Sequence, residues 1–434
     1  MSKKETAIQP NIETREEFYT NYPSFKYWNV NKSSDLFSPE PINIYIHIPF
    51  CVQICNFCYY KTEKIKSQYD IENYVESLCK EIALVASKRE YSKTPVDSIY
   101  IGGGTPTLLK PKQFTRIVDV LKKYHDISSA EFTLESAAGT FNKEKVECYV
   151  KNGVTRMSMG VQSFDDEILR MSNRKHVQKL VFNSLELLRG YEGLVVNIDI
   201  LSGLVGDTHE SFSHTVREAI NSNVDAITFY KFKTYANTAF YQKSLRNDDI
   251  ELPSAEQEIE FMESALDILQ SSDYSMWTTF AFTKNNYKHT YIEKTWRGKD
   301  CVSYGVSAFG KIGNVSYQNT NNLLHYKASI EEGTLPLYRQ YKLSLKDEIV
   351  KELLLCVARL NSYKKAEFVE KFGFDYFEFL PKEIDFLYTN GFIKEGTDEL
   401  RLTNKGILFA DYIGKVLVDG FKAKIGDDQY QLIY

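Results

Sequence analysis

Between residues 42 and 271, six short apolar runs alternate with longer amphipathic segments, and this alternation restricts the fold more than any other feature. The runs are INIYIHI (42–48), SIYIG (98–102), EFTLE (131–135), RMSMG (156–160), LVVNIDI (194–200) and AITFYKF (226–232). A helical pattern follows each run, and parallel strands need such a helix to cross from one strand to the next. The runs are nearly continuous in apolar character, which is typical of strands covered on both faces. The pattern predicts an α/β fold with a parallel sheet, either open or closed into a partial barrel.

Chemically unusual residues follow most of these runs. Three cysteines follow the first run, GGGT (102–105) follows the second, and Glu135 ends the third. Gln162 and Ser163 follow the fourth run, and Asp199 lies at the end of the fifth. Active sites of parallel α/β proteins lie at the carboxyl ends of the strands. We therefore expect these residues to form one site.

Cys51, Cys55 and Cys58 lie within eight residues, although the whole chain has only seven cysteines. Three thiolates at this spacing fit one face of a 4Fe–4S cluster, which normally takes four cysteine ligands. Three protein ligands leave one iron open to bind a small molecule. A structural zinc site instead takes four ligands, and no second Cys/His pair occurs at zinc-finger spacing. The spacing predicts an iron–sulfur cluster with one open iron.

The composition bears on the partners of the chain. The 434 residues carry a formal net charge of −5 with a sequence pI of about 5.9, so a nucleic-acid partner is not expected. The N-terminal stretch is polar, and no run of 18 apolar residues occurs, so neither a signal peptide nor a membrane span is expected. We expect a cytoplasmic protein without a membrane partner.

A change of pattern after about residue 345 predicts a further domain. Helical segments at 346–359, 364–372 and 381–390 lead to a hairpin-like stretch at 391–406 and a last helix through residue 417. This order suggests a winged-helix-like appendage. We divide the chain into an N-terminal arm (1–40), a barrel (41–275), an extension that completes the active site (276–345) and a C-terminal helical domain (346–434).

Several motifs occur in an order that resembles one enzyme family. They are YTNYPSF (19–25), YIHIPFC…C…C, YIGGGTPTLL, GVTRMSMGVQSFDDEILRMSNRKH, NIDILSGL, YGVSAFG and LTNKGILFADYI. Together they resemble the radical S-adenosylmethionine (SAM) superfamily and, within it, the oxygen-independent coproporphyrinogen III oxidases. The resemblance covers nearly the whole chain. It implies a partial (β/α)6 barrel in which a 4Fe–4S cluster binds SAM and cleaves it to a 5′-deoxyadenosyl radical.

The resemblance also assigns residues to the cofactors, with the three cysteines as cluster ligands. The SAM-binding residues that it implies are Tyr45, Phe57, Gly103, Gly104, Thr105, Glu135, Gln162, Arg174 and Asp199, with Phe309 at a second SAM. The two glycines let the backbone approach the methionine part of SAM, and the two carboxylates accept hydrogen bonds from its amine or its ribose hydroxyls. We predict Tyr45 and Lys231 as catalytic residues. His47 fits a core residue, and Cys301 fits an inert buried thiol better than a reactive one.

Three activities remain open on this scaffold. The first is oxidative decarboxylation of two propionates of coproporphyrinogen III. The second is radical methyl transfer or cyclopropanation with two SAM molecules, and the third is a haem chaperone without the oxidase reaction. The expected partners are a small-molecule substrate, either a porphyrinogen or another biosynthetic intermediate, and an electron donor such as flavodoxin or ferredoxin.

Local departures from the oxidase pattern bear on this choice. The YTNYP motif and DCVSYGVSAFGKIGNVSYQN (300–319) favour the oxidase over the chaperone, which usually carries HNxxYW where this chain has HTYIEKTW (289–296). However, YYKT (59–62) replaces the glycine–cysteine continuation, Glu17 and Phe18 replace proline–arginine, and Lys231 replaces a small alanine. The missing arginine matters for a substrate with four carboxylates, because arginine–carboxylate pairs orient a substrate as well as bind it.

Overall fold

The computed structural model describes residues 22–30, 41–89, 94–174, 177–233, 235–246, 252–360, 363–396 and 398–426. Six parallel strands form its centre: β1 (Ile42–Ile48), β4 (Thr94–Gly103), β6 (Glu131–Ser136), β7 (Arg156–Gln162), β8 (Val195–Ser202) and β9 (Ala226–Lys231). They lie side by side in chain order, and every neighbouring pair is parallel. These are the six runs found in the sequence, so the predicted α/β fold with a parallel sheet is confirmed.

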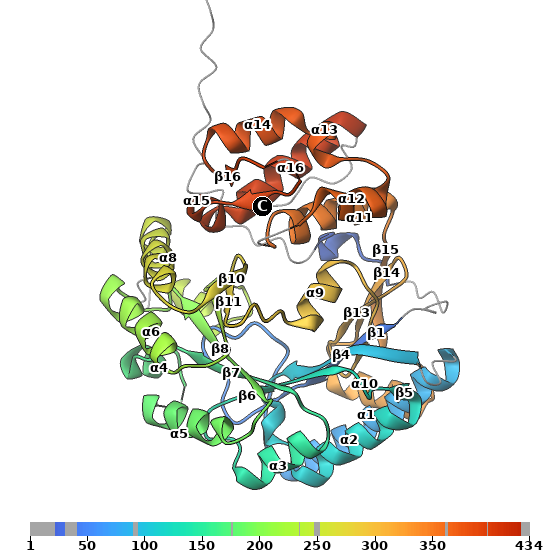
Figure 1. The fold of residues 1–434 in the computed structure, drawn as a ribbon. Coiled ribbons are helices and arrows are strands. Elements are labelled where there is room, and N and C mark those ends of the chain that lie inside the picture. Colours follow the sequence, from blue (N-terminus) through green and yellow to red (C-terminus); the bar gives the residue numbers. More distant parts are fainter. Residues whose placement is uncertain are drawn as a thin grey trace, which may run out of the picture.

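Helices cover the outside of this sheet, as Figure 1 shows. They are α1 (Gln68–Arg89), α2 (Pro111–Tyr124), α3 (Lys143–Lys151), α4 (Asp166–Met171), α5 (Gln178–Arg189), α6 (His209–Asn221), α7 (Ala239–Ser244) and α8 (Ala255–Gln270). Several begin at a polar residue whose side chain accepts a hydrogen bond from the first turn, as Asn142, Thr208 and Ser254 do. Such caps fix where each crossover helix starts after its strand.

The strands are buried on both faces, as expected, although apolar and polar residues alternate along them. Ile42, Ile44 and Ile46 of β1 are fully buried in the main hydrophobic core, which also includes the inner faces of the helices. Tyr45 and His47 point to the opposite side of β1, where their side chains hydrogen-bond to each other. The same alternation recurs on the other parallel strands. The sheet is therefore a partial barrel whose inner face is polar, and we call the space that it encloses the lumen.

Further strands extend the barrel at both edges into a sheet of 13 strands. The hairpin of β10 (Ser275–Thr278) and β11 (Ala281–Thr283) joins β9, and β12 (Cys301–Tyr304) pairs with β1 in parallel. Antiparallel strands β13 (Phe309–Ile312), β14 (Val315–Asn319) and β15 (Leu337–Lys342) follow, with α10 (Leu323–Glu331) between the last two, and the short β5 (His125–Asp126) pairs with β4. The segment that leads into α9 (Thr290–Trp296) lies against the lumen, because Tyr287 Oη and the backbone N–H of Thr290 both donate to Glu131 of β6.

The C-terminal part has a hydrophobic core of its own, formed by residues between 349 and 421. Its elements are α11 (Leu345–Glu352), a π-helical turn (Leu353–Val357), α12 (Lys365–Phe372), α13 (Tyr376–Phe379), α14 (Pro381–Thr389), β16 (Ile393–Lys394), β17 (Arg401–Leu402), α15 (Asn404–Leu408) and α16 (Ala410–Ile425). Helices followed by a two-stranded hairpin match the predicted order, although the last helix runs to Ile425 rather than to residue 417. Figure 1 shows this part, in orange and red, stacked on one side of the barrel.

Only residues 22–30 of the predicted N-terminal arm are described. The beginning of the YTNYPSF motif, with Glu17 and Phe18 before it, lies outside the described residues. The described part packs on the extension, where Asn29 forms a bridge with Gln340 of β15 and Phe25 stacks on Phe309. This segment therefore covers the strands that follow β12.

Candidate active site

A cavity of about 590 Å³ lies at the carboxyl ends of the parallel strands. Its lining includes the cysteine loop between β2 (Phe50–Cys51) and β3 (Glu63–Lys64), the ends of β6 to β9, and part of the C-terminal region. The predicted site residues that line it are Cys51, Cys55, Phe57, Cys58, Gly103, Gly104, Thr105, Glu135, Gln162, Arg174, Asp199 and Lys231. Ser163 does not join them: it is buried, and its hydroxyl contacts Thr215 of α6.

The three cysteines meet hydrogen-bond donors at the edge of this cavity. Thr105 Oγ1 lies 3.6 Å from Cys51 Sγ, and Arg174 Nη1 donates to Cys55 Sγ at 3.3 Å. Burial raises the pKa of the Cys51 thiol to about 11 and that of the Cys58 thiol to about 12. Without a bound metal these thiols are protonated at neutral pH, and cluster binding must displace their protons. Donors to sulfur together with an arginine suit the negative charge of an iron–sulfur cluster bound by thiolates.

The donor geometry separates a cluster from a single metal ion. In the described part of the chain, no three His, Cys, Asp or Glu side chains are arranged around one point where a metal ion could bind. A mononuclear zinc site needs its ligands at one point, whereas the ligands of a 4Fe–4S cluster each bind a different iron. The three cysteines are therefore not placed as a mononuclear metal site requires.

The glycine loop after β4 packs directly against the cysteine loop. A Cβ on Gly104 would lie 2.6 Å from the carbonyl oxygen of Phe50 and 3.0 Å from Cys51 Sγ. Gly103 has a φ of +111°, and a Cβ there would meet the His47 ring at 2.5 Å. The backbone N–H groups of Gly104 and Thr105 donate to the carbonyl oxygens of Ile48 and Phe50. Only glycine fits at positions 103 and 104, because the neighbouring loop and the His47 ring occupy the space of a side chain.

Two carboxyl groups face the cavity, that of Glu135 on β6 and that of Asp199 on β8. Glu135 accepts hydrogen bonds from Tyr100 Oη at 2.5 Å and from the Gly103 N–H at 2.9 Å, and burial raises its pKa to about 7. Asp199 accepts from Ser158 Oγ at 3.1 Å and from Asn197 Nδ2 at 2.9 Å, and burial raises its pKa as well. Each carboxyl is thus fixed in position with lone pairs left for a ligand.

Gln162, Arg174 and Phe57 complete the same wall. Gln162 ends β7 with a φ of +73°, which is rare for a residue with a side chain and occurs at a break in the pairing of β7 with β8. Arg174 donates through Nη2 to the carbonyl oxygen of Gly160, and its guanidinium lies 5.9 Å from the centre of the Phe57 ring. Arg174 therefore links the end of β7 to the cysteine loop.

The two predicted catalytic residues occupy different environments. Tyr45 lies in the lumen, where its hydroxyl is 2.9 Å from His47 Nδ1 and burial raises its pKa well above the usual range. Lys231 lines the cavity and forms an ion pair with Glu258 of α8 at 2.8 Å. His47 behaves as the expected core residue, because its other ring nitrogen contacts the carbonyl oxygen of Lys61 at 2.8 Å.

Phe309 and Cys301 lie elsewhere. Phe309 is not part of the cavity lining; it stacks on Phe25 and forms an edge contact with Trp28. Cys301 is buried on β12, 3.8 Å from Tyr291 Oη, and burial raises the pKa of its thiol to about 11. A protonated, buried thiol agrees with the prediction that Cys301 is unreactive.

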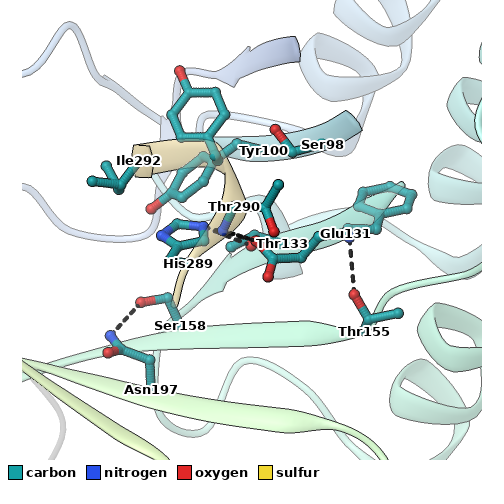
Figure 2. Close-up of polar contacts among 12 residues, drawn as sticks. Ser98, Tyr100, Glu131, Thr133, Thr155, Ser158, Asn197, His289, Thr290 and Ile292 are labelled. Atoms are coloured by element: carbon teal, nitrogen blue, oxygen red, sulfur yellow. Dashed lines mark hydrogen bonds and ion pairs between the residues drawn. The ribbon is translucent and has the colours of Figure 1, made fainter. Parts of the chain in front are cut away.

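A polar network in the lumen was not predicted from the sequence. Figure 2 shows His289 close to Thr133 and Tyr100, with Ser158 and Asn197 on the neighbouring strands. His289 Nε2 is 3.2 Å from Thr133 Oγ1, and Asn197 Nδ2 donates to Ser158 Oγ at 2.8 Å. Burial holds the pKa of His289 well below its usual range, so the imidazole is neutral. The alternation of polar and apolar residues along each strand is the signal that could have revealed this network.

The C-terminal wall of the cavity was also missed. Arg359, at the end of the π-helical turn, is 1% exposed and forms an ion pair with Asp411 of α16. The backbone N–H of Thr279 donates to the carbonyl oxygen of Arg359 at 3.0 Å. These contacts place a C-terminal cation beside the barrel.

Comparison with known proteins agrees with the geometry. The profile of the radical SAM superfamily matches residues 45–219, the stretch that holds the cysteine loop, the glycine loop and both carboxyl groups. Residues 45–219 therefore form a radical SAM domain. As a radical SAM protein, the chain takes a 4Fe–4S cluster and SAM as cofactors.

The relatives of this radical SAM protein carry two kinds of name. The haem chaperone HemW of Bacillus subtilis is 28% identical over 375 residues, which cover 85% of this chain and 97% of HemW. The oxygen-independent coproporphyrinogen III oxidase of Helicobacter pylori is 27% identical over 393 residues, which cover 85% of each chain. The solved structure of coproporphyrinogen III oxidase (HemN) from Escherichia coli has the same fold, with a TM-score of 0.79, 23% identity and coverage of 92% of this chain and 96% of HemN. Among the helices that the structure describes, none is both long enough and apolar enough to cross a membrane.

Proposed function

We propose that this radical SAM protein holds its 4Fe–4S cluster through Cys51, Cys55 and Cys58 and uses it to cleave SAM reductively. When bound, the cluster and SAM supply a 5′-deoxyadenosyl radical that removes a hydrogen atom from the substrate. The proposal is carried by one observation: the three cysteines, the two glycines of the glycine loop and both carboxyl groups line a single cavity. A low-potential donor such as flavodoxin or ferredoxin supplies the electron.

The residues of the cavity divide the work of binding SAM. The backbone N–H groups of Gly103, Gly104 and Thr105 already donate within the protein, so this backbone contacts the methionine part through its carbonyl oxygens, which the absence of side chains at the glycines allows. Glu135 and Asp199 accept hydrogen bonds from the ammonium group and the ribose hydroxyls. The Arg174 guanidinium, already bonded to Cys55 Sγ, helps to balance the negative charge of a thiolate-bound cluster.

We further propose that the substrate is a carboxylate-bearing tetrapyrrole, and that the reaction is the oxidative decarboxylation of propionates on coproporphyrinogen III. Each propionate loses one hydrogen atom to the radical, then CO2, and the one electron left over passes to a one-electron acceptor. The names of the relatives point to haem metabolism. The cavity is large and has aromatic walls, where Tyr59 stacks on Tyr60 and Tyr230 stacks on Phe280. Lys231 and Arg359 add positive charge for substrate carboxylates on walls away from the cysteine loop.

The haem chaperone is the second candidate, because the cations that would orient propionates already have carboxylate partners. Lys231 pairs with Glu258, and Arg359 pairs with Asp411. A bound propionate would have to compete with Glu258 and Asp411 for these two cations. Haem binding depends less on the two cations. A two-SAM methyltransferase would need Phe309 at its second SAM, but Phe309 is not part of the cavity lining.

Anaerobic turnover tests these candidates. The reconstituted protein is incubated with SAM, a reductant and coproporphyrinogen III, and the products are analysed by mass spectrometry. Vinyl products together with 5′-deoxyadenosine are the expected result. Deoxyadenosine or S-adenosylhomocysteine without a change in the porphyrin would transfer the proposal to the methyltransferase, and an intact cluster without SAM cleavage would favour the chaperone.

The variant Cys55→Ala tests the cluster assignment itself. It should lose the iron–sulfur absorption and all deoxyadenosine formation, because the cluster would lack one of its three protein ligands. Cys79→Ala, at a half-buried cysteine of α1 outside the cavity, is the matched control and should keep both. Deoxyadenosine formation by Cys55→Ala would contradict the assignment.

A further inference from the structure

Arg156 is a buried cation in the lumen. It begins β7, opposite Thr133 of β6 and Val195 of β8, and only 4% of the residue is exposed. Arg156 lies on the same face of β7 as Ser158. The alternate residues Met157 and Met159 point to the other face and belong to the hydrophobic core. The Arg156 side chain therefore shares the lumen with the network around His289, whose pKa is lowered by burial and further by the charge of Arg156.

Arg156 lacks the direct partner that a buried charge normally has. Among the residues that the structure describes, Nε of Arg156 has no hydrogen-bond partner, and no carboxylate forms an ion pair with the guanidinium. The other buried arginine of the cavity region, Arg359, does have a carboxylate beside it. An isolated buried charge is unfavourable unless other charges compensate for it through the low-dielectric interior.

The compensating charges lie higher in the barrel, with Glu135 one layer above Arg156 and Asp199, which is opposite Gly160, two layers above it. Glu135 is opposite Ser158 in the pairing of β6 with β7, and Ser158 donates to Asp199 of β8. Ser158 is two residues after Arg156 on the same face, so Arg156 lies beneath both carboxyl groups, on the side away from the cavity. Its attraction for them acts through space, without a hydrogen bond that would occupy their lone pairs.

We propose that Arg156 is a positioning residue for SAM: from beneath Glu135 and Asp199 it keeps both groups in the carboxylate form that accepts hydrogen bonds from SAM. This inference rests on the SAM site proposed above. Arg156 leaves the carboxylate oxygens open to the cavity, so one cation supports two acceptors at once.

Electrostatics gives the sign of the effect. Burial is the main cause that raises the pKa of Glu135, to about 7, and that of Asp199. The positive charge of Arg156 lowers both: it is the strongest lowering cause for Asp199, whereas for Glu135 the hydrogen bonds from Tyr100 and Gly103 have larger effects. Removing that charge raises both pKa values further, so a larger fraction of each group is protonated near neutral pH. The other titratable groups that act on Glu135 or feel its charge are Asp199 of β8, Cys51, and the tyrosines Tyr45, Tyr59, Tyr60, Tyr100, Tyr230 and Tyr291. Burial keeps the six tyrosines neutral over this range, so they do not titrate with Glu135.

The test measures SAM affinity against pH. SAM binding to the anaerobic, cluster-loaded protein is followed by equilibrium dialysis between about pH 5.5 and 9, and the EPR spectrum of the reduced cluster reports SAM at the iron. In the wild type, affinity should rise with pH through about 7, where Glu135 ionises. Arg156→Gln should move this midpoint up by about half a pH unit, which weakens binding roughly threefold on the acid side and leaves it near wild type at the alkaline end.

Two further variants separate charge from packing. Arg156→Lys keeps the charge and should restore a midpoint close to that of the wild type. Thr228→Val changes a buried lumen residue that donates to Asn197 without changing charge, and it should not move the midpoint. Where Arg156→Gln fails to fold, Arg156→Met provides the neutral side chain without unsatisfied amide groups.

An unchanged midpoint in the neutral variants, or an equal loss of affinity at every pH, would overturn the inference, because a purely structural role predicts that pattern. Glu135→Gln distinguishes this failure from failure of the SAM site. If Glu135→Gln leaves SAM affinity and its pH dependence intact, the SAM site is wrong. If it abolishes the pH dependence while the neutral Arg156 variants keep the midpoint, only the role of Arg156 is wrong.

Discussion

At the scale of single residues, Gly103 shows how closely two loops are fitted around the candidate SAM site. Its φ is +111°, and a Cβ would lie 2.5 Å from the His47 ring. We expect Gly103→Ala to lower stability by about 1–3 kcal/mol through backbone strain and, in addition, to weaken SAM binding at least tenfold by displacing the loop. Thermal unfolding and equilibrium dialysis with SAM measure the two effects separately.

The matched control is Gly153→Ala. Gly153 has a φ of +100°, but a Cβ there would meet no atom within 4 Å. The control therefore carries similar backbone strain without the collision. It should lose stability to a similar degree and keep its SAM affinity. Equal SAM affinities in the two variants would show that contact with His47 does not matter for the site.

At the scale of elements, the sequence predicts the six parallel strands because each has its own apolar run and following helix. The period-2 alternation, visible in EFTLE and RMSMG, would also have predicted a curved sheet with a polar lumen. The lumen network could not be predicted in the same way. His289 meets Thr133 across 156 residues of sequence, and only the folded barrel brings them together. Likewise, Gln162 was assigned by resemblance alone, because nothing about a glutamine in the sequence predicts its left-handed backbone.

Helix α1 makes a similar long-range contact through the side chain of Glu81. Glu81 is 1% exposed and accepts hydrogen bonds from the Gly305 N–H, Asn319 Nδ2 and Tyr326 Oη, at 2.7, 2.8 and 2.6 Å. These donors come from the turn after β12, from β14 and from α10, so one side chain connects the barrel to its extension. We expect Glu81→Gln to lower the free energy of unfolding by about 2–4 kcal/mol, because the amide group turns a donor toward buried donors.

Chemical denaturation measures the loss, with Glu76→Gln as the control on the same helix. Glu76 forms an exposed ion pair with Lys80, and such a pair contributes little to stability because water and salt screen it. A similar small effect for both variants would mean that Glu81 does not hold the extension in place.

At the scale of the whole molecule, the cavity joins two parts with separate hydrophobic cores. The residues proposed to hold the cluster and SAM belong to the barrel, whereas Arg359 and Asp411 belong to the C-terminal part. Arg359 also bonds to the β10–β11 hairpin through the Thr279 N–H. The Arg359–Asp411 pair is therefore placed to hold the C-terminal wall against the barrel.

Asp411→Asn should loosen this wall, because it leaves a buried guanidinium without its carboxylate partner, a change that costs about 3–5 kcal/mol in buried pairs. Hydrogen exchange should then speed up in α16 and in the β10–β11 hairpin, and coproporphyrin III binding, followed by fluorescence, should weaken. SAM affinity should stay near wild type, since the residues proposed to bind SAM lie on the barrel side. Asp419→Asn removes the partner of Lys415 on the same helix without reaching the cavity, and it should change none of the three measurements. Weaker SAM binding in Asp411→Asn, with the β10–β11 hairpin still protected, would contradict this division of the cavity between barrel and C-terminal part.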